Sequence, residues 1–204
     1  MGRDKKYNRS ELLDKAVALF WLKGFHATST ADLVEALGIN RKSLYVEFSS
    51  KQGLFEAALE HYNTNYLNQI FSSFEGEKAA ELGLDAIKAI FADLANAAEG
   101  DSYGIGCFLC NTASERASLD PEVGSHIDAY FERIEQNFSR ILNDALKNKT
   151  LRSDLNIKNI AAFFTSSLLG VITSIRAKAS VKQIWGTYQT ISTMVDRLLV
   201  DEKN

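Results

Sequence analysis

The 204-residue sequence predicts an all-α fold of about nine helices. Apolar residues recur at helical spacing along nearly the whole chain, and no segment alternates apolar and polar residues over the length of a strand. The chain has only one proline, Pro121, so long helices are free to form. A composition of 46% hydrophobic and 24% charged residues is that of a globular protein, which excludes a disordered or fibrous chain.

Two helices are predicted at the start of the chain. Residues 8–23 place apolar side chains at i, i+3, i+4 and i+7, and Gly24 is a typical helix stop. Residues 31–37 predict a second, shorter helix, for which Thr28-Ser29 offers an N-cap and Gly38 a stop.

Two further helices are expected after this second glycine. Residues 41–48 form the third, which Asn40 can cap. Ser49 resembles the first residue of a capping box, which opens a fourth helix through about Phe71. The first seventy residues therefore predict three helices followed by a longer one.

The rest of the chain, beyond a polar break near Gly76, predicts five helices. Asp120 and Pro121 are a typical start signal for the most regular of them. The next one is apolar on more than one face, which indicates either a core side and a side that meets a second copy, or a central helix of a monomeric bundle. The five helices span residues 84–99, 107–118, 121–148, 157–178 and 181–200.

Charge is distributed unevenly along the chain. The net charge is −3, yet residues 1–51 carry nine basic and six acidic side chains, which gives them +3 and leaves −6 for the remainder. A basic end on an acidic body is expected when that end meets a polyanion, although scattered surface charge produces similar numbers.

The two short helices around Gly38 have the proportions of a helix-turn-helix, whose second helix enters the DNA major groove. At 100° per residue, Leu44 and Phe48 point the same way and predict a buried seam completed by Leu33, Leu37 and Ile39. The opposite side presents five candidate DNA contacts, Arg41, Lys42, Ser43, Tyr45 and Val46. An ordinary αα-corner of a globular protein gives the same bare pattern.

These side chains suit base and phosphate recognition. Arginine and lysine donate to guanine edges, serine donates or accepts, and valine contacts the thymine methyl group. Tyr45 and Lys51 lie where phosphates can be met, and Thr28 and Ser29 are further candidate DNA contacts at the start of the preceding helix. Glu47 is unfavourable near phosphate and is left without an assigned role.

The run from Leu12 to Leu59, LLDKAVALFWLKGFHATSTADLVEALGINRKSLYVEFSSKQGLFEAAL, resembles the DNA-binding domain of the TetR family of bacterial transcriptional regulators. The resemblance implies a homodimer on a palindromic double-stranded operator, with a C-terminal all-α domain that binds an inducer and dimerises through its last two helices. We therefore expect a helix-turn-helix DNA-binding domain at residues 1–51 and a helical ligand-binding and dimerisation domain at residues 52–204. Matching positions include Ala16, Leu19, Phe20, Gly24, Phe25, Thr28, Ser29, Leu33, Ala36, Gly38, Ile39, Ser43, Leu44, Tyr45, Phe48, Lys51, Leu54 and Phe55.

Carried over position by position, the family's groove-facing residues fall on the same five side chains from Arg41 to Val46, and its phosphate contacts fall on Tyr45 and Lys51. The sequence departs from the family at Lys42, where a small residue or proline is common, and at Glu47, where histidine or an aromatic residue is frequent. The operator sequence is therefore not transferable.

A second, shorter resemblance concerns the two cysteines. Residues 106–115, GCFLCNTASE, are similar to the start of the C-terminal domain in the NemR-like and YxaF-like branch, in some members of which the cysteine at Cys107 responds to electrophiles or oxidants. The other interpretation is that Cys107 and Cys110 are packed as small apolar side chains. No metal site is expected, because His26, His61 and His126 lack paired ligand spacing.

The predicted inducer site lies among the inward faces of the C-terminal helices, and an apolar, aromatic or electrophilic small molecule is the default ligand. Any of the candidate side chains also serves as ordinary core. The candidates are Phe91, Cys107, Phe108, Tyr130, Phe131, Phe164 and Trp185.

We therefore predict a dimeric, cytoplasmic, ligand-responsive transcriptional regulator, most simply a repressor, without a cofactor. The N-terminus has no apolar signal region, and the most apolar run, residues 161–175, is too short to span a bilayer. An enzyme with Cys107 as nucleophile finds no histidine base in a recognisable motif, and a protein-binding helical adaptor is the remaining alternative.

Overall fold

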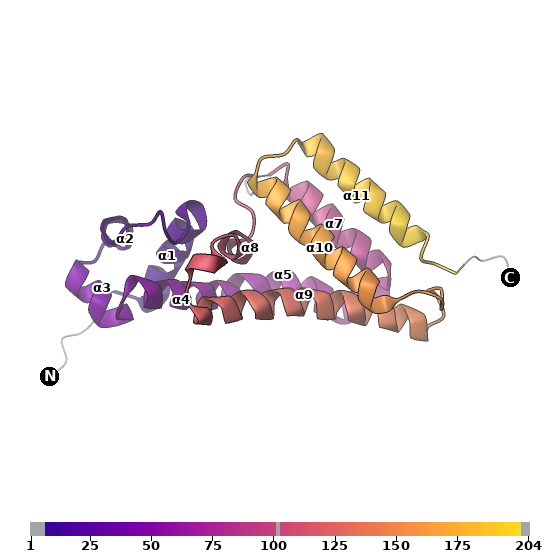
Figure 1. The fold of residues 1–204 in the computed structure, drawn as a ribbon, viewed down its shortest axis with the longest axis horizontal. Coiled ribbons are helices and arrows are strands. Elements are labelled where there is room, and N and C mark those ends of the chain that lie inside the picture. Colours follow the sequence, from indigo (N-terminus) through magenta and orange to yellow (C-terminus); the bar gives the residue numbers. More distant parts are fainter. Residues whose placement is uncertain (1–6, 101–102, 201–204) are drawn as a thin grey trace. The chain divides into compact units, whose positions relative to one another are not determined.

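The computed structural model describes residues 7–100 and 103–200, and these residues are helical along most of their length (Figure 1). Within these two ranges no strand forms, and the β-type pairing is an isolated antiparallel bridge between Leu151 and Leu199. The all-α prediction is confirmed.

The chain forms two compact units that are not continuous in sequence. The first unit runs to Asn68 and takes in Cys107–Ile127, and the second contains Gln69–Gly106 and Asp128–Asn204. This division differs from the expected boundary after residue 51. The physical reason is that Phe108 packs its ring 5.7 Å from Phe55 and 5.5 Å from Tyr62, so a segment from the middle of the chain completes the first core.

The first unit is built on α1 and α4, which pack together and carry the two short helices between them. Leu33 and Leu44 of these short helices have no exposed surface, so the helices pack through their apolar sides. The elements of this unit are α1 (Arg9–Lys23), α2 (Thr30–Leu37), α3 (Arg41–Phe48), α4 (Lys51–Tyr62), a π-helical segment (Asn63–Leu67), α8 (Phe108–Ala113) and a 3₁₀ turn (Arg116–Ser118).

Polar caps define where the N-terminal helices begin. Asn8, Ser29 and Asn40 each accept a backbone N–H in the first turn of the helix that follows. The sequence predicts a cap at Asn40 and one at Thr28-Ser29, whereas it places Asn8 inside the first helix. The expected cap at Ser49 is wrong, because Ser49 ends α3 with φ 65° and Ser50 caps α4 by accepting from the backbone N–H of Gly53 at 2.9 Å. The turn between α3 and α4 is therefore one residue longer than expected.

The second unit contains α7, α10 and α11, which lie side by side in Figure 1. A bidentate ion pair joins α5 to α9, with Arg133 Nε and Nη2 donating to the Glu75 carboxylate at 2.7 and 2.8 Å. This bond holds the pKa of Glu75 below its usual range. The helices of this unit are α5 (Asn68–Glu75), α6 (Glu77–Leu82), α7 (Asp85–Ala97), α10 (Ile157–Arg176), α11 (Val181–Asp196) and the part of α9 (Pro121–Lys147) that follows Ile127.

Two elements of this unit differ from the sequence prediction. The helix α6 forms in the expected break, because a run of strong helix formers stands there between Gly76 and Gly83. The last helix ends at Asp196, earlier than expected, because the backbone N–H of Val200 donates to Thr150 O at 3.0 Å and draws the chain into the isolated bridge.

The helix α10 is longer than the apolar run that the sequence analysis considered. By length and composition α10 could cross a membrane, and it is the one helix in residues 7–100 and 103–200 that could. A core helix of a soluble protein meets the same criterion, and Phe164 of α10 is indeed buried at 1% exposure. About two thirds of its apolar window nevertheless remains uncovered in this single chain.

The buried seam makes a direct prediction about stability. Leu44→Ala removes a side chain with no exposed surface and leaves a cavity under α3, so the free energy of unfolding should fall by about 2–5 kcal/mol. Urea denaturation followed by circular dichroism measures this change. Val46→Ala, on the same helix but 73% exposed, is the matched control and should stay within about 0.5 kcal/mol. Equal losses in both variants would contradict the seam.

Candidate nucleic-acid interface

The outer side of α3 is a basic face, which we define as Arg41, Lys42, Ser43, Tyr45 and Val46. Arg41 and Lys42 are exposed, Tyr45 is 38% exposed and Val46 is 73% exposed, while Ser43 is half-buried. The five side chains therefore form one surface, which agrees with the geometry expected from a helix of 3.6 residues per turn.

The opposite side of α3 is the buried seam. Leu44 is fully buried and Phe48 is 5% exposed, and both pack in the same core as Leu33 and Leu37 of α2. Ile39, which stands in the turn between the two helices, is only half-buried. The seam fixes the rotation of α3 about its axis, so the basic face cannot turn inward without exposing apolar surface to water.

Arg41 and Tyr45 act as a pair on the basic face. They lie one turn apart, with Arg41 Nη2 donating to the Tyr45 hydroxyl at 3.5 Å and the guanidinium carbon 5.6 Å from the ring centroid. The hydrogen bond from Arg41 lowers the pKa of the Tyr45 hydroxyl. The guanidinium is thus held over an aromatic ring while its remaining N–H groups stay available to an acceptor.

The two candidates before α2 have different surroundings. Thr28 is fully buried, and its hydroxyl donates to Gly24 O at 2.6 Å, so it closes the turn after α1 and has no surface to offer DNA. Ser29 is exposed and caps α2 in a capping box with Asp32. The side-chain bond from Lys23 at 2.9 Å, together with Ser29, holds the pKa of Asp32 well below its usual range.

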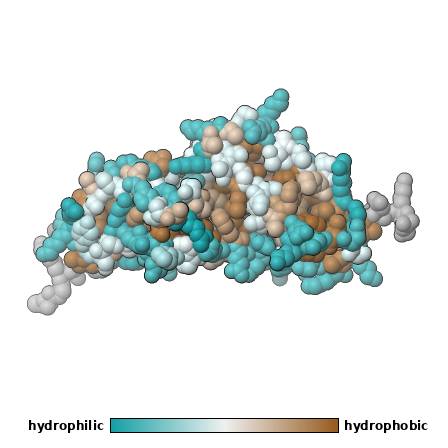
Figure 2. All heavy atoms as spheres, viewed as in Figure 1, coloured by the Kyte–Doolittle hydropathy of each residue, from teal (hydrophilic) through white to brown (hydrophobic). Residues whose placement is uncertain are grey.

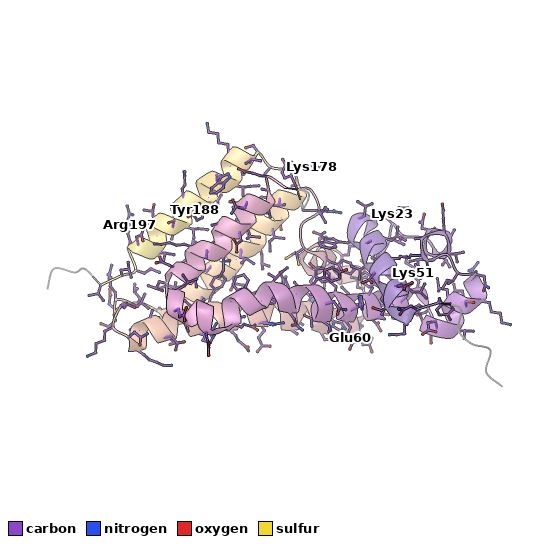
Figure 3. The ribbon with its side chains drawn as sticks, turned by 180° about the vertical axis from the view of Figure 1, so that it is seen from behind. Lys23, Lys51, Glu60, Lys178, Tyr188 and Arg197 are labelled. Carbon is purple, nitrogen blue, oxygen red and sulfur yellow. The ribbon has the colours of Figure 1, made fainter. Side chains whose placement is uncertain are left out.

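Lys51, labelled in Figure 3, is the first residue of α4, and its side chain lies against an aromatic ring. Its ammonium nitrogen lies 4.3 Å from the centroid of Phe25, and partial burial lowers its pKa. The turn that carries Phe25 is itself held by Glu115, whose carboxylate accepts from the backbone N–H groups of Phe25 and His26 at 3.2 and 3.1 Å. Sequence reasoning missed Glu115, because nothing local relates it to a turn ninety residues earlier.

Glu47 is the acidic residue of α3 that the sequence analysis left unassigned. The Arg9 guanidinium Nε lies 3.2 Å from one carboxylate oxygen, and the Tyr7 hydroxyl donates to the other at 3.2 Å. The Glu47 side chain is 5% exposed, and the Arg9 guanidinium carbon lies 5.3 Å from the centroid of the Phe48 ring. Glu47 therefore belongs to an ion pair at the end of α3, which partly neutralises its charge.

The two thiols of the first unit differ in exposure. Cys107 is buried at 8% exposure, and the Tyr62 hydroxyl donates to its sulfur at 3.7 Å. Burial raises the pKa of that hydroxyl far above its usual value. Cys110 is half-buried, and the two cysteines are not joined in a disulfide. Within residues 7–100 and 103–200 no group of three potential metal ligands forms.

The predicted ligand residues fall in separate clusters. Cys107 and Phe108 belong to the first unit, and the others belong to the second. Phe91 and Phe164 lie 6.4 Å apart, ring to ring, in a core cluster. Tyr130 and Phe131 form a second aromatic contact at 5.7 Å.

Trp185 lies on α11, apart from these clusters. Its indole nitrogen donates to Glu99 Oε1 at 2.7 Å, and its ring contacts Tyr188, which Figure 3 labels. Neither contact includes another predicted ligand residue. That the seven candidates together line an inducer site remains a prediction.

An open groove lies between α10 and α11 in the second unit. Phe163 is 43% exposed and Met194 is 37% exposed along it, and Figure 2 shows hydrophobic surface over the part of the molecule that α10 occupies. The sequence indicated an apolar second face on α10 but not which residues of α11 would face it. The groove is lined by Phe163, Ser167, Gln183, Gly186, Thr187, Thr190, Ile191 and Met194.

Two family models match this chain. The model described as bacterial regulatory proteins, tetR family, matches residues 12–58, which include α2 and α3. The model described as tetracyclin repressor-like, C-terminal domain, matches residues 83–191, which is more than half of the chain. The two matches cover α2, α3 and most of the second unit.

Two transcriptional regulators are similar to this chain along most of their length. The chain is 32% identical over 188 residues to the HTH-type transcriptional repressor ComR of Escherichia coli K12, covering 90% of this chain and 86% of ComR. It is 28% identical over 172 residues to the uncharacterized HTH-type transcriptional regulator YezE of Bacillus subtilis, covering 84% of this chain and 87% of YezE.

Solved structures share the fold. Reduced E. coli NemR superposes with a TM-score of 0.78 at 18% identity, covering 96% of this chain and 98% of NemR. The TetR regulator CifR, as a cysteine mutant complexed with 26-base-pair operator DNA, superposes with a TM-score of 0.77 at 22% identity, covering 93% of this chain and 97% of CifR. On the strength of the family models and the ComR relationship, the chain belongs to the TetR family of bacterial transcriptional regulators.

Proposed function

We propose that this TetR-family regulator is a repressor that binds a double-stranded operator through the basic face of α3. The observation that carries the proposal is the burial of Leu44 and Phe48 on one side of α3, while Arg41, Lys42 and Val46 are exposed on the other. A helix of this kind fits the major groove, which admits one α-helix and displays a distinct pattern for each base pair.

Two kinds of DNA contact are expected from this unit. On the basic face, Arg41 and Lys42 reach base edges, and Val46 offers an apolar surface to a thymine methyl group. Lys51 and the Tyr45 hydroxyl bind phosphates on either side of the groove, which fixes the register of α3 without selecting a sequence. Ser29 is exposed at the N-terminus of α2, but its backbone N–H and its hydroxyl both donate to Asp32 Oδ2 at 2.8 Å, so a phosphate contact there would compete with the capping box.

The regulator works as a homodimer that pairs through α10 and α11. The groove between these helices exposes Phe163 and Met194 beside small and hydroxyl side chains, a surface that a second copy would cover. Two copies of α3 then meet successive major grooves about one helical turn, 34 Å, apart on a palindromic operator.

An inducer would act by population shift. A small molecule that binds the second unit more tightly in a conformation with a different α3 spacing lowers operator affinity by that difference in binding free energy. Phe91 and Phe164 are the best-supported apolar wall among the predicted ligand residues, because they share one aromatic cluster. We infer a cytoplasmic location, where the operator DNA of a bacterium lies.

Separate substitutions test base reading and phosphate binding. Lys42→Ala should cost about 1–3 kcal/mol of binding free energy on operator DNA and relax base preference, if Lys42 reads a base edge. Lys51→Ala should weaken binding to operator and random DNA alike. Fluorescence anisotropy with both DNAs at several salt concentrations makes the comparison. Equal losses on the two DNAs for Lys42→Ala would refute base reading by this side chain.

The proposed α10–α11 dimer interface can be tested by a single substitution. Phe163→Glu places a charge in the groove between α10 and α11, so sedimentation velocity should show monomers at concentrations where the wild type is dimeric. Leu22→Glu, at a 66% exposed apolar site on α1, is the matched control and should remain dimeric. A dimeric Phe163→Glu variant would place the interface elsewhere.

A second candidate function is thiol sensing by Cys107. The hydrogen bond from the Tyr62 hydroxyl favours the thiolate, the form that attacks electrophiles, whereas the burial of Cys107 opposes it. This proposal is supported by that single contact and by the similarity to NemR in fold.

The cysteines can be tested separately. N-ethylmaleimide should release operator DNA from the wild type and from Cys110→Ser, but not from Cys107→Ser, in an anisotropy assay with mass spectrometry of the adducts. Release from Cys107→Ser as fast as from the wild type would remove the sensor role from Cys107.

A further inference from the structure

The turn between α1 and α2 is bound by a carboxylate from a distant part of the chain. Glu115 follows α8, and its two carboxylate oxygens each accept a backbone N–H, from Phe25 at 3.2 Å and from His26 at 3.1 Å. Successive backbone N–H groups in a turn form a concave site for an anion, and an ionised acceptor makes stronger hydrogen bonds than a neutral one. Here the protein itself supplies the anion. We call these two hydrogen bonds the Glu115 contact.

The residues around the Glu115 contact leave room for it and reinforce it. The backbone of Gly24 has φ 82°, which favours glycine, and a Cβ at this position would overlap Glu115 Oε1. Ser118 Oγ lies 2.8 Å from His26 Nε2, and the Thr28 hydroxyl closes the same turn by donating to Gly24 O. The turn is therefore fixed both by its own residues and by the segment that follows α8.

Phe25 links this turn to the candidate DNA surface. Its ring lies 4.9 Å from the ring of Phe55 in α4, and the ring centroid lies 4.3 Å from the ammonium nitrogen of Lys51. The Lys51 ammonium group thus has an aromatic face beside it, which attracts a cation. A lysine side chain loses rotamer entropy when it binds a phosphate, so a side chain that is already oriented binds at a smaller entropic cost.

The negative charge of Glu115 has a separate electrostatic effect, which opposes DNA binding. Partial burial lowers the pKa of Lys51, and the nearby carboxylates of Glu115 and Asp32 oppose that shift. Close to a duplex, a carboxylate also repels phosphates. A purely electrostatic role of Glu115 therefore predicts tighter DNA binding when its charge is removed, whereas a positioning role predicts weaker binding. The two roles differ in sign.

We propose that Glu115 is a positioning residue for operator binding: it fixes Phe25, and Phe25 orients the Lys51 ammonium group toward a DNA phosphate. This inference rests on the proposed function, because it requires Lys51 to bind a phosphate. It adds to DNA binding a residue that lies outside the family match at residues 12–58. Every residue that it uses belongs to the first unit.

A double-mutant cycle with Lys51 tests the proposal in the full-length protein. Glu115→Ala removes both hydrogen bonds, so operator affinity in fluorescence anisotropy should fall about fivefold. In the Lys51→Ala background the same substitution should change affinity by no more than about twofold, because the side chain through which Glu115 acts is absent. The matched control, Glu122→Ala, removes an exposed carboxylate from the same unit and should stay within about twofold of the wild type.

A charge-matched variant separates the hydrogen bonds of Glu115 from its charge. Glu115→Gln removes the same charge as Glu115→Ala but keeps one acceptor oxygen, so it should bind operator DNA more tightly than Glu115→Ala does. Amide hydrogen exchange at Phe25 and His26 should be faster in Glu115→Ala than in the wild type, because both N–H groups lose their acceptor. Since phosphate contacts carry no sequence information, the ratio of operator to random-DNA affinity should not change in Glu115→Ala.

The outcomes separate this inference from the proposed function. Unchanged or tighter operator binding by Glu115→Ala, or an equal loss with and without Lys51, would overturn the positioning role while leaving operator binding by the wild type intact. A loss confined to operator DNA would overturn it as well, because Glu115 would then act through α2 and α3. If the wild type itself prefers no DNA fragment, the proposed function fails too.

Discussion

The rotation of α3 about its own axis is the constraint on which the rest of the first unit depends. Eight residues are too few to form a stable helix alone in water, so tertiary packing must hold this one. Leu44 and Phe48 supply that packing against α2 and the α1–α4 pair. Since the same two side chains determine which face of α3 is buried, they also determine that the basic face is exposed. The stability of α3 and the exposure of its basic face therefore depend on the same two side chains.

Two acidic side chains of this unit, Asp32 and Glu47, pair with cations near the candidate DNA surface. Lys23 binds Asp32 at the start of α2, and Arg9 binds Glu47 at the end of α3. Surface ion pairs of this kind contribute little to stability. Their larger effect is electrostatic, because they leave Arg41 and Lys42 as the charges that a duplex would meet first.

The segment that begins at Cys107 belongs to one domain by family match and to the other by packing. It belongs to the tetracyclin repressor-like C-terminal match, yet it packs within the first unit. Phe108 completes the aromatic core there, and Glu115 binds the turn between α1 and α2 that also positions Lys51 through Phe25. A displacement of this segment would therefore reach the backbone just before α2 and α3, the helices that we propose contact DNA.

By itself, the sequence determined most of the helices, although not α6, together with the turn at Gly38 and the two faces of α3, because these follow from local caps and from a 3.6-residue period that each segment carries within itself. It did not predict that Thr28 is buried, that Glu115 holds a turn ninety residues earlier, or that Arg9 compensates Glu47. Its seven candidate ligand residues belong to both units, and their grouping into one ligand site remains a prediction. Those features depend on which distant segments pack together, and only the tertiary structure decides them, because contacts between residues far apart in the chain leave no periodic or spacing signal in a single sequence.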